Sequence, residues 1–167
     1  MTTRLLAAAI LGLLCMPLLA TGAQRLQLTV DAREAPRRVL RARLTIPVAP
    51  GPLTLVYPKW LPGTHGPTGP VIDLVGIRMS GGGQPLAWQR DSVDLHSFRL
   101  IVPDGVQNLD VALDLVSGLP DGGLASPASL TTELAMIKWT QVVLYPAGVP
   151  TGELAAGFSA SRIDTCF

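Results

Sequence analysis

The sequence predicts an all-β protein, an antiparallel β-sandwich of about eight strands preceded by a signal peptide. Apolar residues recur at every second position in several short segments, as they do in half-buried strands. Turn sequences rich in glycine and proline separate these segments. Helical spacing prevails nowhere after residue 23, so the sequence favours sheets throughout.

Residues 1–23 have the features of a signal peptide. Arg4 precedes an uncharged apolar run at 5–20, and Thr21-Gly22-Ala23 offers small residues for cleavage near Ala23. The sixteen residues of this run fall short of the roughly 20 that span a bilayer, which favours cleavage over an uncleaved anchor. We therefore expect a periplasmic or secreted protein without a membrane segment after cleavage. The excess of arginine over lysine, with abundant alanine, suggests a bacterial gene.

Two kinds of strand are predicted along the mature chain. Strict alternation of apolar and polar residues predicts four half-buried strands, at 26–30, 40–46, 96–102 and 109–115. Segments that are apolar on both sides, or nearly so, predict central strands at 53–57, 71–79 and 136–145. Turns are predicted at 47–52, 81–83, 103–105 and 119–123.

The predicted domain organisation is a sandwich at residues 24–150 and an irregular tail at 151–167. Residues 58–70 contain four prolines and three glycines, which excludes a strand and predicts an ordered but irregular loop. The tail has weak periodicity, and we expect it to be loosely held. Only Cys166 remains after cleavage, so no disulfide is expected within the mature chain.

Composition and motifs argue against several functions. The chain has 13 Lys+Arg and 12 Asp+Glu, a net charge of +1, and no basic run that would bind nucleic acid. His65 and His96 are its only histidines, and neither belongs to a helical zinc motif, so we expect no metal ligands, no cofactor and no catalytic residues. Asp91 and Asp94 are interpreted as turn residues rather than a catalytic pair.

The loop at 57–70 contains the candidate functional residues. Connections of this length without secondary structure are uncommon unless they are functional or disordered. One interpretation is structural: Trp60 and Leu61 fill one end of the sandwich. The other makes Lys59, Trp60 and His65 a recognition surface. The remaining tryptophans, at positions 88 and 139, lie in strand-like sequence and are expected in the core.

The same loop carries a resemblance to a known family. The chain is similar to the N-terminal domain of the glycyl aminopeptidases, metallopeptidase family sixty-one, over roughly residues 25–150. The matching sequences are Tyr-Pro-Lys-Trp-Leu-Pro-Gly at 57–63, His-Gly-Pro-Thr-Gly-Pro at 65–70, Leu-Ala-Trp-Gln-Arg-Asp at 86–91 and Trp-Thr-Gln-Val-Val-Leu-Tyr-Pro-Ala-Gly at 139–148. The last of these resembles the final strand of that domain.

The resemblance implies a non-catalytic β-sandwich that leads into a zinc domain in an exported aminopeptidase with a preference for glycine and alanine. The family's His-Glu-x-x-His helix and its later glutamate have no matching positions here, so no catalytic residue is carried over. We expect the chain to be inactive alone. After residue 150 the sequence departs from the family's usual continuation, which we interpret as a frameshift, an early stop or a gene fragment.

Two functions follow as hypotheses. In the absence of the zinc domain, the β-sandwich exposes the apolar face that would pack against that domain. We therefore expect a catalytic peptidase domain or a second copy of the chain as partner. The alternative is a free-standing exported module that binds a peptide or a carbohydrate through Trp60 and the loop.

Overall fold

The structure, a computed structural model, describes residues 25–61, 65–118, 128–149 and 156–160. These residues form strands, turns and three short 3-10 helices, η1 (Ala35–Arg37), η2 (Val71–Asp73) and η3 (Trp139–Gln141). No helix in these ranges is both long and apolar enough to span a membrane. The predicted signal peptide at 1–23 and the predicted turn at 119–123 lie outside the described residues.

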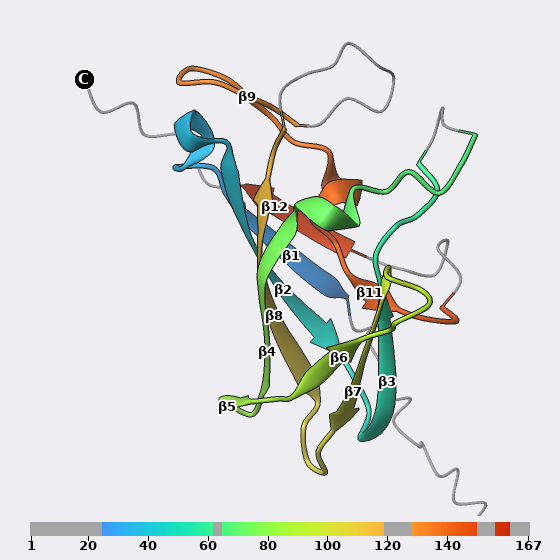
Figure 1. The fold of residues 1–167 in the computed structure, drawn as a ribbon. Coiled ribbons are helices and arrows are strands. Elements are labelled where there is room, and N and C mark those ends of the chain that lie inside the picture. Colours follow the sequence, from blue (N-terminus) through green and yellow to red (C-terminus); the bar gives the residue numbers. More distant parts are fainter. Residues whose placement is uncertain (1–24, 62–64, 119–127, 150–155, 161–167) are drawn as a thin grey trace, which may run out of the picture.

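Two sheets pack against each other and confirm the predicted all-β sandwich (Figure 1). The larger sheet has the order β12 (Ala156–Ala160), β1 (Leu26–Asp31), β2 (Val39–Pro47), β8 (Asn108–Val116), β4 (Leu74–Gly81) and β5 (Gln84–Pro85). The smaller sheet has the order β11 (Tyr145–Pro146), β3 (Gly51–Val56), β7 (Ser97–Val102) and β6 (Trp88–Arg90). A separate hairpin pairs β9 (Ser129–Leu130) with β10 (Ala135–Met136). Among the described residues, all strand pairs are antiparallel except β1 with β12.

The central pair of the larger sheet, β2 and β8, follows directly from the alternating sequence. Their inward residues face each other in register and are buried: Leu40 with Leu115, Ala42 with Leu113, Leu44 with Val111, and Ile46 with Leu109. On the outer face Thr45 Oγ1 donates a hydrogen bond of 2.9 Å to Asp110 Oδ1. Full burial of one leucine side chain stabilises the fold by about 1.5–3 kcal/mol, so this pair anchors the core.

The turns after β2 and β7 carry the chain between the two sheets, at the predicted positions. In the smaller sheet Leu55 and Phe98 are fully buried and meet the β2–β8 face within one hydrophobic core. The predicted strand at 96–102 begins one residue later, at Ser97, and His96 immediately precedes it. Trp88 and Trp139 are half-buried and pack against this core, as expected.

The predicted central strand at 71–79 is wrong in two respects. Residues 71–73 form η2, and at its edge β4 pairs only with the two-residue β5. Val75 lies opposite Asp114 on the solvent face of the sheet and is exposed. Leu74 and Met79 are both buried although they lie five residues apart, a spacing that puts side chains on opposite faces of a regular strand. A β-bulge between Val75 and Arg78 corrects the phase, with Gly76 at φ 62°.

The predicted central strand at 136–145, and with it the strand expected from the resemblance at 139–148, is also wrong. The structure divides this segment between β10, η3 and β11, and none of these elements exceeds three residues. Val142 and Leu144 are fully buried, which explains the apolar sequence. The segment lines the core without forming a ladder, and apolar residues alone do not distinguish these two cases.

Strand β12 lies in the segment that the sequence predicts to be an irregular tail. It pairs with β1 from Leu26 opposite Ala156 to Val30 opposite Ala160. The hydroxyl oxygens of Thr29 and Ser159 lie 2.9 Å apart in a hydrogen bond. The expectation of a loose tail therefore fails for Ala156–Ala160, because the open edge of β1 supplies a ladder that the sequence does not reveal. Residues 151–155 and 161–167 lie outside the described residues.

Candidate interaction surface

The loop after β3 is anchored at Tyr57. Its backbone N–H donates 2.8 Å to the carbonyl of His96, which extends the β3–β7 pairing by one residue. Its ring is buried, and its hydroxyl donates 3.1 Å to the carbonyl of Gln141. Burial raises the pKa of Tyr57, and the charge of Asp73 adds to this effect. The described parts of the loop, 57–61 and 65–70, contain no strand, as predicted.

A close approach of two backbones fixes the far side of the loop. The N–H of Gly69 donates 2.9 Å to the carbonyl of Lys59. A Cβ atom at position 69 would lie 1.8 Å from the carbonyl oxygen of Pro58, so only glycine fits here. The carbonyl of Gly69 lies 3.1 Å from His96 Nε2, a hydrogen bond that places the ring N–H on that nitrogen. The two ends of the loop are thus tied together.

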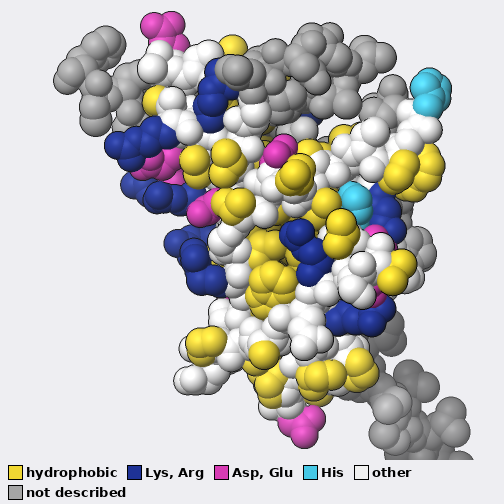
Figure 2. All heavy atoms as spheres, in the orientation of Figure 1, with side chains coloured by type: hydrophobic (Ala, Val, Ile, Leu, Met, Phe, Trp, Pro, Cys, Tyr) yellow, Lys and Arg dark blue, Asp and Glu magenta, His cyan; other side chains and the backbone are white. Residues whose placement is uncertain are grey.

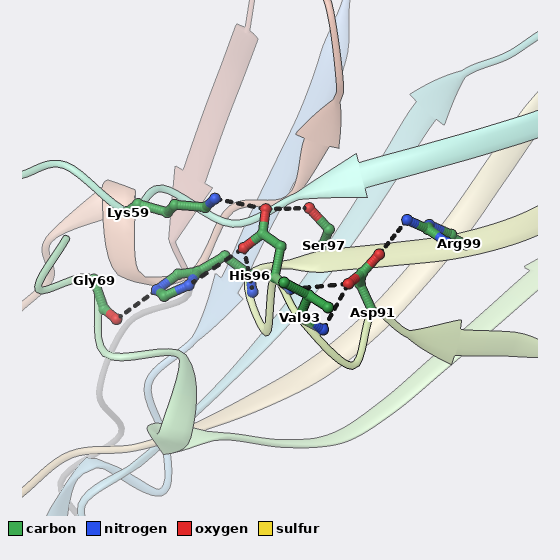
Figure 3. Close-up of polar contacts among 8 residues, drawn as sticks. Lys59, Gly69, Asp91, Val93, His96, Ser97 and Arg99 are labelled. Carbon is green, nitrogen blue, oxygen red and sulfur yellow. Dashed lines mark hydrogen bonds and ion pairs between the residues drawn. The ribbon is translucent and has the colours of Figure 1, made fainter.

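Asp94, in the turn between β6 and β7, is the centre of a polar network (Figure 3). Lys59 Nζ donates 2.5 Å to Asp94 Oδ2, and Ser97 Oγ donates 2.8 Å to the same oxygen. The N–H of His96 donates 3.2 Å to Asp94 Oδ1. The hydrogen bond from Lys59 lowers the pKa of Asp94, and the bonds from Ser97 and His96 act in the same direction. We call Lys59, Gly69, Asp94, His96 and Ser97 the Asp94 network.

Asp91 shapes the same turn. Its Oδ1 accepts hydrogen bonds of 2.8 Å from the N–H groups of Val93 and Asp94, and its other oxygen pairs with Arg99 (Figure 3). The bonds from Asp94 and Val93 hold the pKa of Asp91 below its usual value, with a smaller contribution from Arg99. Both aspartates are turn residues, as interpreted from the sequence, and both bind neighbouring groups.

The three predicted binding residues have different environments. Lys59 forms an ion pair with Asp94, whereas the side chain of Trp60 is 67% exposed and His65 is also exposed. Figure 2 shows the two histidine side chains well apart. Lys59, Trp60 and His65 therefore differ in exposure and in contacts, and their joint role in recognition stays a prediction. The structural interpretation holds for Leu61, which is buried, but is wrong for Trp60, which does not fill the end of the sandwich.

Four large apolar side chains are exposed on the segments that the Asp94 network joins. They are Trp60 (67% exposed), Ile72 (84%), Val93 (93%) and Leu95 (52%), which we call the apolar rim. Trp60 follows Lys59, Val93 and Leu95 flank Asp94, and Ile72 lies in η2 just after Gly69. A contiguous patch of exposed apolar side chains is typical of an interaction surface, whereas single exposed apolar residues occur on most proteins. Sequence reasoning missed three of the four rim residues, because a lone apolar residue in a turn carries no periodicity.

The polar side chains of the Asp94 network bind one another and the neighbouring backbone. Ser97 is buried and donates to Asp94 rather than to an imidazole, so no Ser–His–Asp relay forms. The imidazole of His96 stacks on Tyr57, with 6.2 Å between ring centroids. In the part of the chain that the structure describes, no three His, Cys, Asp or Glu side chains are grouped as metal ligands. These residues therefore do not fit the zinc that the resemblance attributes to full-length relatives.

Comparisons with known proteins agree with this fold. The profile of a family described as Peptidase M61 N-terminal domain matches residues 27–160. The chain is also similar to the crystal structure of an aminopeptidase N family protein from Idiomarina loihiensis, with a TM-score of 0.62 and 16% identity. That match covers 74% of this chain and 20% of the other, so the chain spans about a fifth of that protein. At this identity the likeness shows the fold alone. No protein of curated function matches the sequence.

Proposed function

Because the chain belongs to the peptidase M61 N-terminal domain family, we propose that it is the non-catalytic β-sandwich of an exported zinc aminopeptidase of the glycyl aminopeptidase type. In this role the sandwich is inactive alone and packs against the catalytic zinc domain. The family match supports the peptidase context, and the signal-like segment at 1–23 supports export to the periplasm or the medium.

The apolar rim is the observation that carries the docking role. Trp60, Ile72, Val93 and Leu95 lie on turns that the Asp94 network holds in place, so little conformational entropy is lost when a partner covers them. Covering the part of each side chain that is still exposed adds favourable hydrophobic free energy to the contact. The rim is thus suited to a permanent contact with a neighbouring domain.

Hydrolysis by the purified chain tests the first half of the proposal. We expect the chain from residue 24 onward to release no product from glycyl or alanyl p-nitroanilide, with or without added zinc. Turnover that follows the protein through purification and is abolished by a chelator would contradict the proposal.

Reconstitution tests the second half. The zinc domain of a full-length family member, expressed separately, is assayed for kcat/KM on glycyl p-nitroanilide with increasing amounts of this chain. We expect saturable stimulation that the double variant Trp60→Ala/Ile72→Ala loses. Met136→Ala is the matched control, because Met136 is 57% exposed and lies in the β9–β10 hairpin outside the rim. Equal stimulation by both variants would exclude the rim as the docking site.

One observation favours the alternative function, a free-standing module that binds a peptide or a carbohydrate. Trp60 presents an exposed aromatic surface next to Lys59, whose position is fixed by Asp94. Such a surface stacks well on a sugar ring or a peptide side chain. Binding to a glycan or peptide array that Trp60→Ala abolishes, together with no effect on the zinc domain, would favour this alternative.

A further inference from the structure

The outer face of the larger sheet carries a polar pocket that has no part in the proposed docking. The pocket crosses β2, β8 and β4 and has a volume of about 240 Å³. Its lining residues are Arg41, Ala42, Arg43, Arg78, Ala112 and Asp114. In Figure 2, Lys and Arg side chains lie along the left flank of the molecule, with Asp and Glu side chains among them.

Strand register explains how the pocket arises. Arg43 of β2 and Arg78 of β4 lie opposite the same residue of β8, Ala112. Neighbouring strands are about 4.8 Å apart, so two guanidinium-bearing side chains stand on either side of a single methyl group. A larger residue at position 112 would fill the space between them. In the adjacent row Arg41 lies opposite Asp114.

The β-bulge places Arg78 in this row. Without the extra residue, Arg78 would share the inward phase of Leu74, and Met79 would point outward. Gly76, at φ 62°, allows the bulge, and a Cβ atom there would lie 3.4 Å from Asp114 Oδ2 and 3.9 Å from Arg78 Nη1. The distortion of β4 thus turns a basic side chain to the outer face and keeps an apolar one in the core.

The charge of the pocket is not balanced. Within the described ranges, Arg41, Arg43 and Arg78 form no ion pair or hydrogen bond with another side chain. Asp114 contributes the single carboxylate among the lining residues, which leaves an excess of two positive charges. The next carboxylate along β8, Asp110, lies outside this pocket, in the adjoining hollow, where it accepts a hydrogen bond from Thr45 and keeps its negative charge. A dianionic group would neutralise this excess.

A second hollow continues from the same arginines. It has a volume of about 700 Å³ and also includes Arg43, Arg78 and Ala112. Away from these residues it passes over Pro85, Leu86 and Trp88. An anionic site thus borders a surface that suits an apolar or aromatic group.

We propose that this face binds a phosphate monoester with an apolar or aromatic body. Its phosphate lies over Ala112 between Arg43 and Arg78, within reach of Arg41, and its body lies against Leu86 and Trp88. Guanidinium groups bind phosphate through paired, charge-assisted hydrogen bonds, and a monoester carries a charge of about −1.5 to −2 at neutral pH. The site is independent of the docking role and stands whether or not that role is correct.

The test uses three probes at constant ionic strength: phenyl phosphate, inorganic phosphate and phenol. Binding is followed by calorimetry and by the fluorescence of the tryptophans, because Trp88 lines the hollow. We expect phenyl phosphate to bind saturably and about five-fold more tightly than inorganic phosphate, and phenol not to bind. Equal affinities for phenyl phosphate and inorganic phosphate, or no saturable binding of either, would overturn the proposal.

Variants distinguish binding at this pocket from general electrostatic attraction to the protein. We expect Arg43→Gln/Arg78→Gln to weaken phenyl phosphate binding at least about ten-fold. Arg37→Gln/Arg38→Gln removes the same charge at η1, away from the pocket, and is expected to change affinity less than two-fold. Ala112→Glu, which places a carboxylate between the two arginines, is expected to abolish binding and to leave the protein folded by circular dichroism. Unchanged affinity in Arg43→Gln/Arg78→Gln or in Ala112→Glu would overturn the proposal.

Vesicles containing phosphatidic acid identify the source of the phosphate. Flotation with these vesicles that Arg43→Gln/Arg78→Gln loses would assign the site to a lipid headgroup. Phenyl phosphate binding without flotation would assign it to a soluble ester, and either result supports a phosphate site.

Discussion

Strands β2 and β8 and the loop around the Asp94 network are both ordered, but they are held in different ways. The strands share a buried face of eight apolar side chains, four from each strand, and lose little if one outer polar contact is removed. The loop depends on a few atoms: the Lys59–Asp94 pair, the His96–Gly69 hydrogen bond and the absence of a Cβ at position 69. The many contacts between β2 and β8 stabilise the fold as a whole. The few contacts of the Asp94 network fix the position of one surface loop.

Truncation of a buried side chain between β2 and β8 is expected to have the largest effect on stability. Leu113→Ala removes a side chain that is only 1% exposed at the centre of β8, and we expect it to lower the free energy of unfolding by about 2–5 kcal/mol. Urea denaturation measures this as a lower midpoint with an unchanged slope. A loss below about 1 kcal/mol would show that the core does not carry the stability we assign to it.

A methyl group at position 69, where two backbone segments approach closely, is expected to have the next largest effect on stability. Gly69→Ala places a Cβ atom 1.8 Å from the carbonyl oxygen of Pro58, so the backbone must move, and we expect a loss of about 1–3 kcal/mol in urea denaturation. Gly66→Ala is the matched control, because a Cβ there meets only Thr68 Cγ2 at 3.9 Å. We expect its effect to stay within about 0.5 kcal/mol. Similar losses in the two variants would contradict the account.

Removal of one charge from the network has a smaller and pH-dependent effect. Asp94→Asn removes the ion pair with Lys59, and we expect a cost of about 1 kcal/mol at pH 7, because both side chains are partly exposed to solvent. The pKa of Asp94 is lowered in the folded state, so its contribution is present above the unfolded pKa of about 4 and is lost as the pH falls below it. The difference between wild type and variant should therefore shrink as the pH falls below about 4. A difference that does not shrink at acidic pH would mean that the charge is not its cause.

Truncation of the exposed rim has the smallest effect on stability. Trp60→Ala removes a side chain that is 67% exposed, and we expect the free energy of unfolding to change by no more than about 0.5 kcal/mol. Thermal and urea denaturation check this. A loss above about 1.5 kcal/mol would indicate that Trp60 contributes to the packing at the end of the sandwich, as one interpretation of the sequence predicts.

The regular part of the fold was predictable because its strands have one buried and one solvated face. The alternation at 40–46 and 109–115 gives both the strands and their inward residues. It fails at β4, where a bulge changes the phase, and at 136–145, where buried residues such as Val142 and Leu144 line the core without a ladder. It also fails at β12, whose five residues acquire their strand from the edge of β1.

The candidate surface was predictable only in outline. The prolines and glycines at 58–70 indicate an irregular loop, and the described parts of that loop agree. The role of Asp94 and the exposure of Ile72 and Val93 depend on contacts between segments more than twenty residues apart, such as Lys59 with Asp94. No local pattern contains that information, because it arises only when η2 and the β6–β7 turn reach the loop.

The most direct test of the account is a hydrogen-exchange footprint of this chain with and without the zinc domain of a full-length family member. If the zinc domain docks on the apolar rim, amide exchange slows at 57–61, 65–73 and 91–97 when that domain is bound and stays unchanged on β2 and β8. Protection on the outer face of β2 and β8 without protection at the loop, or no protection anywhere, would contradict the docking of a peptidase domain on the apolar rim.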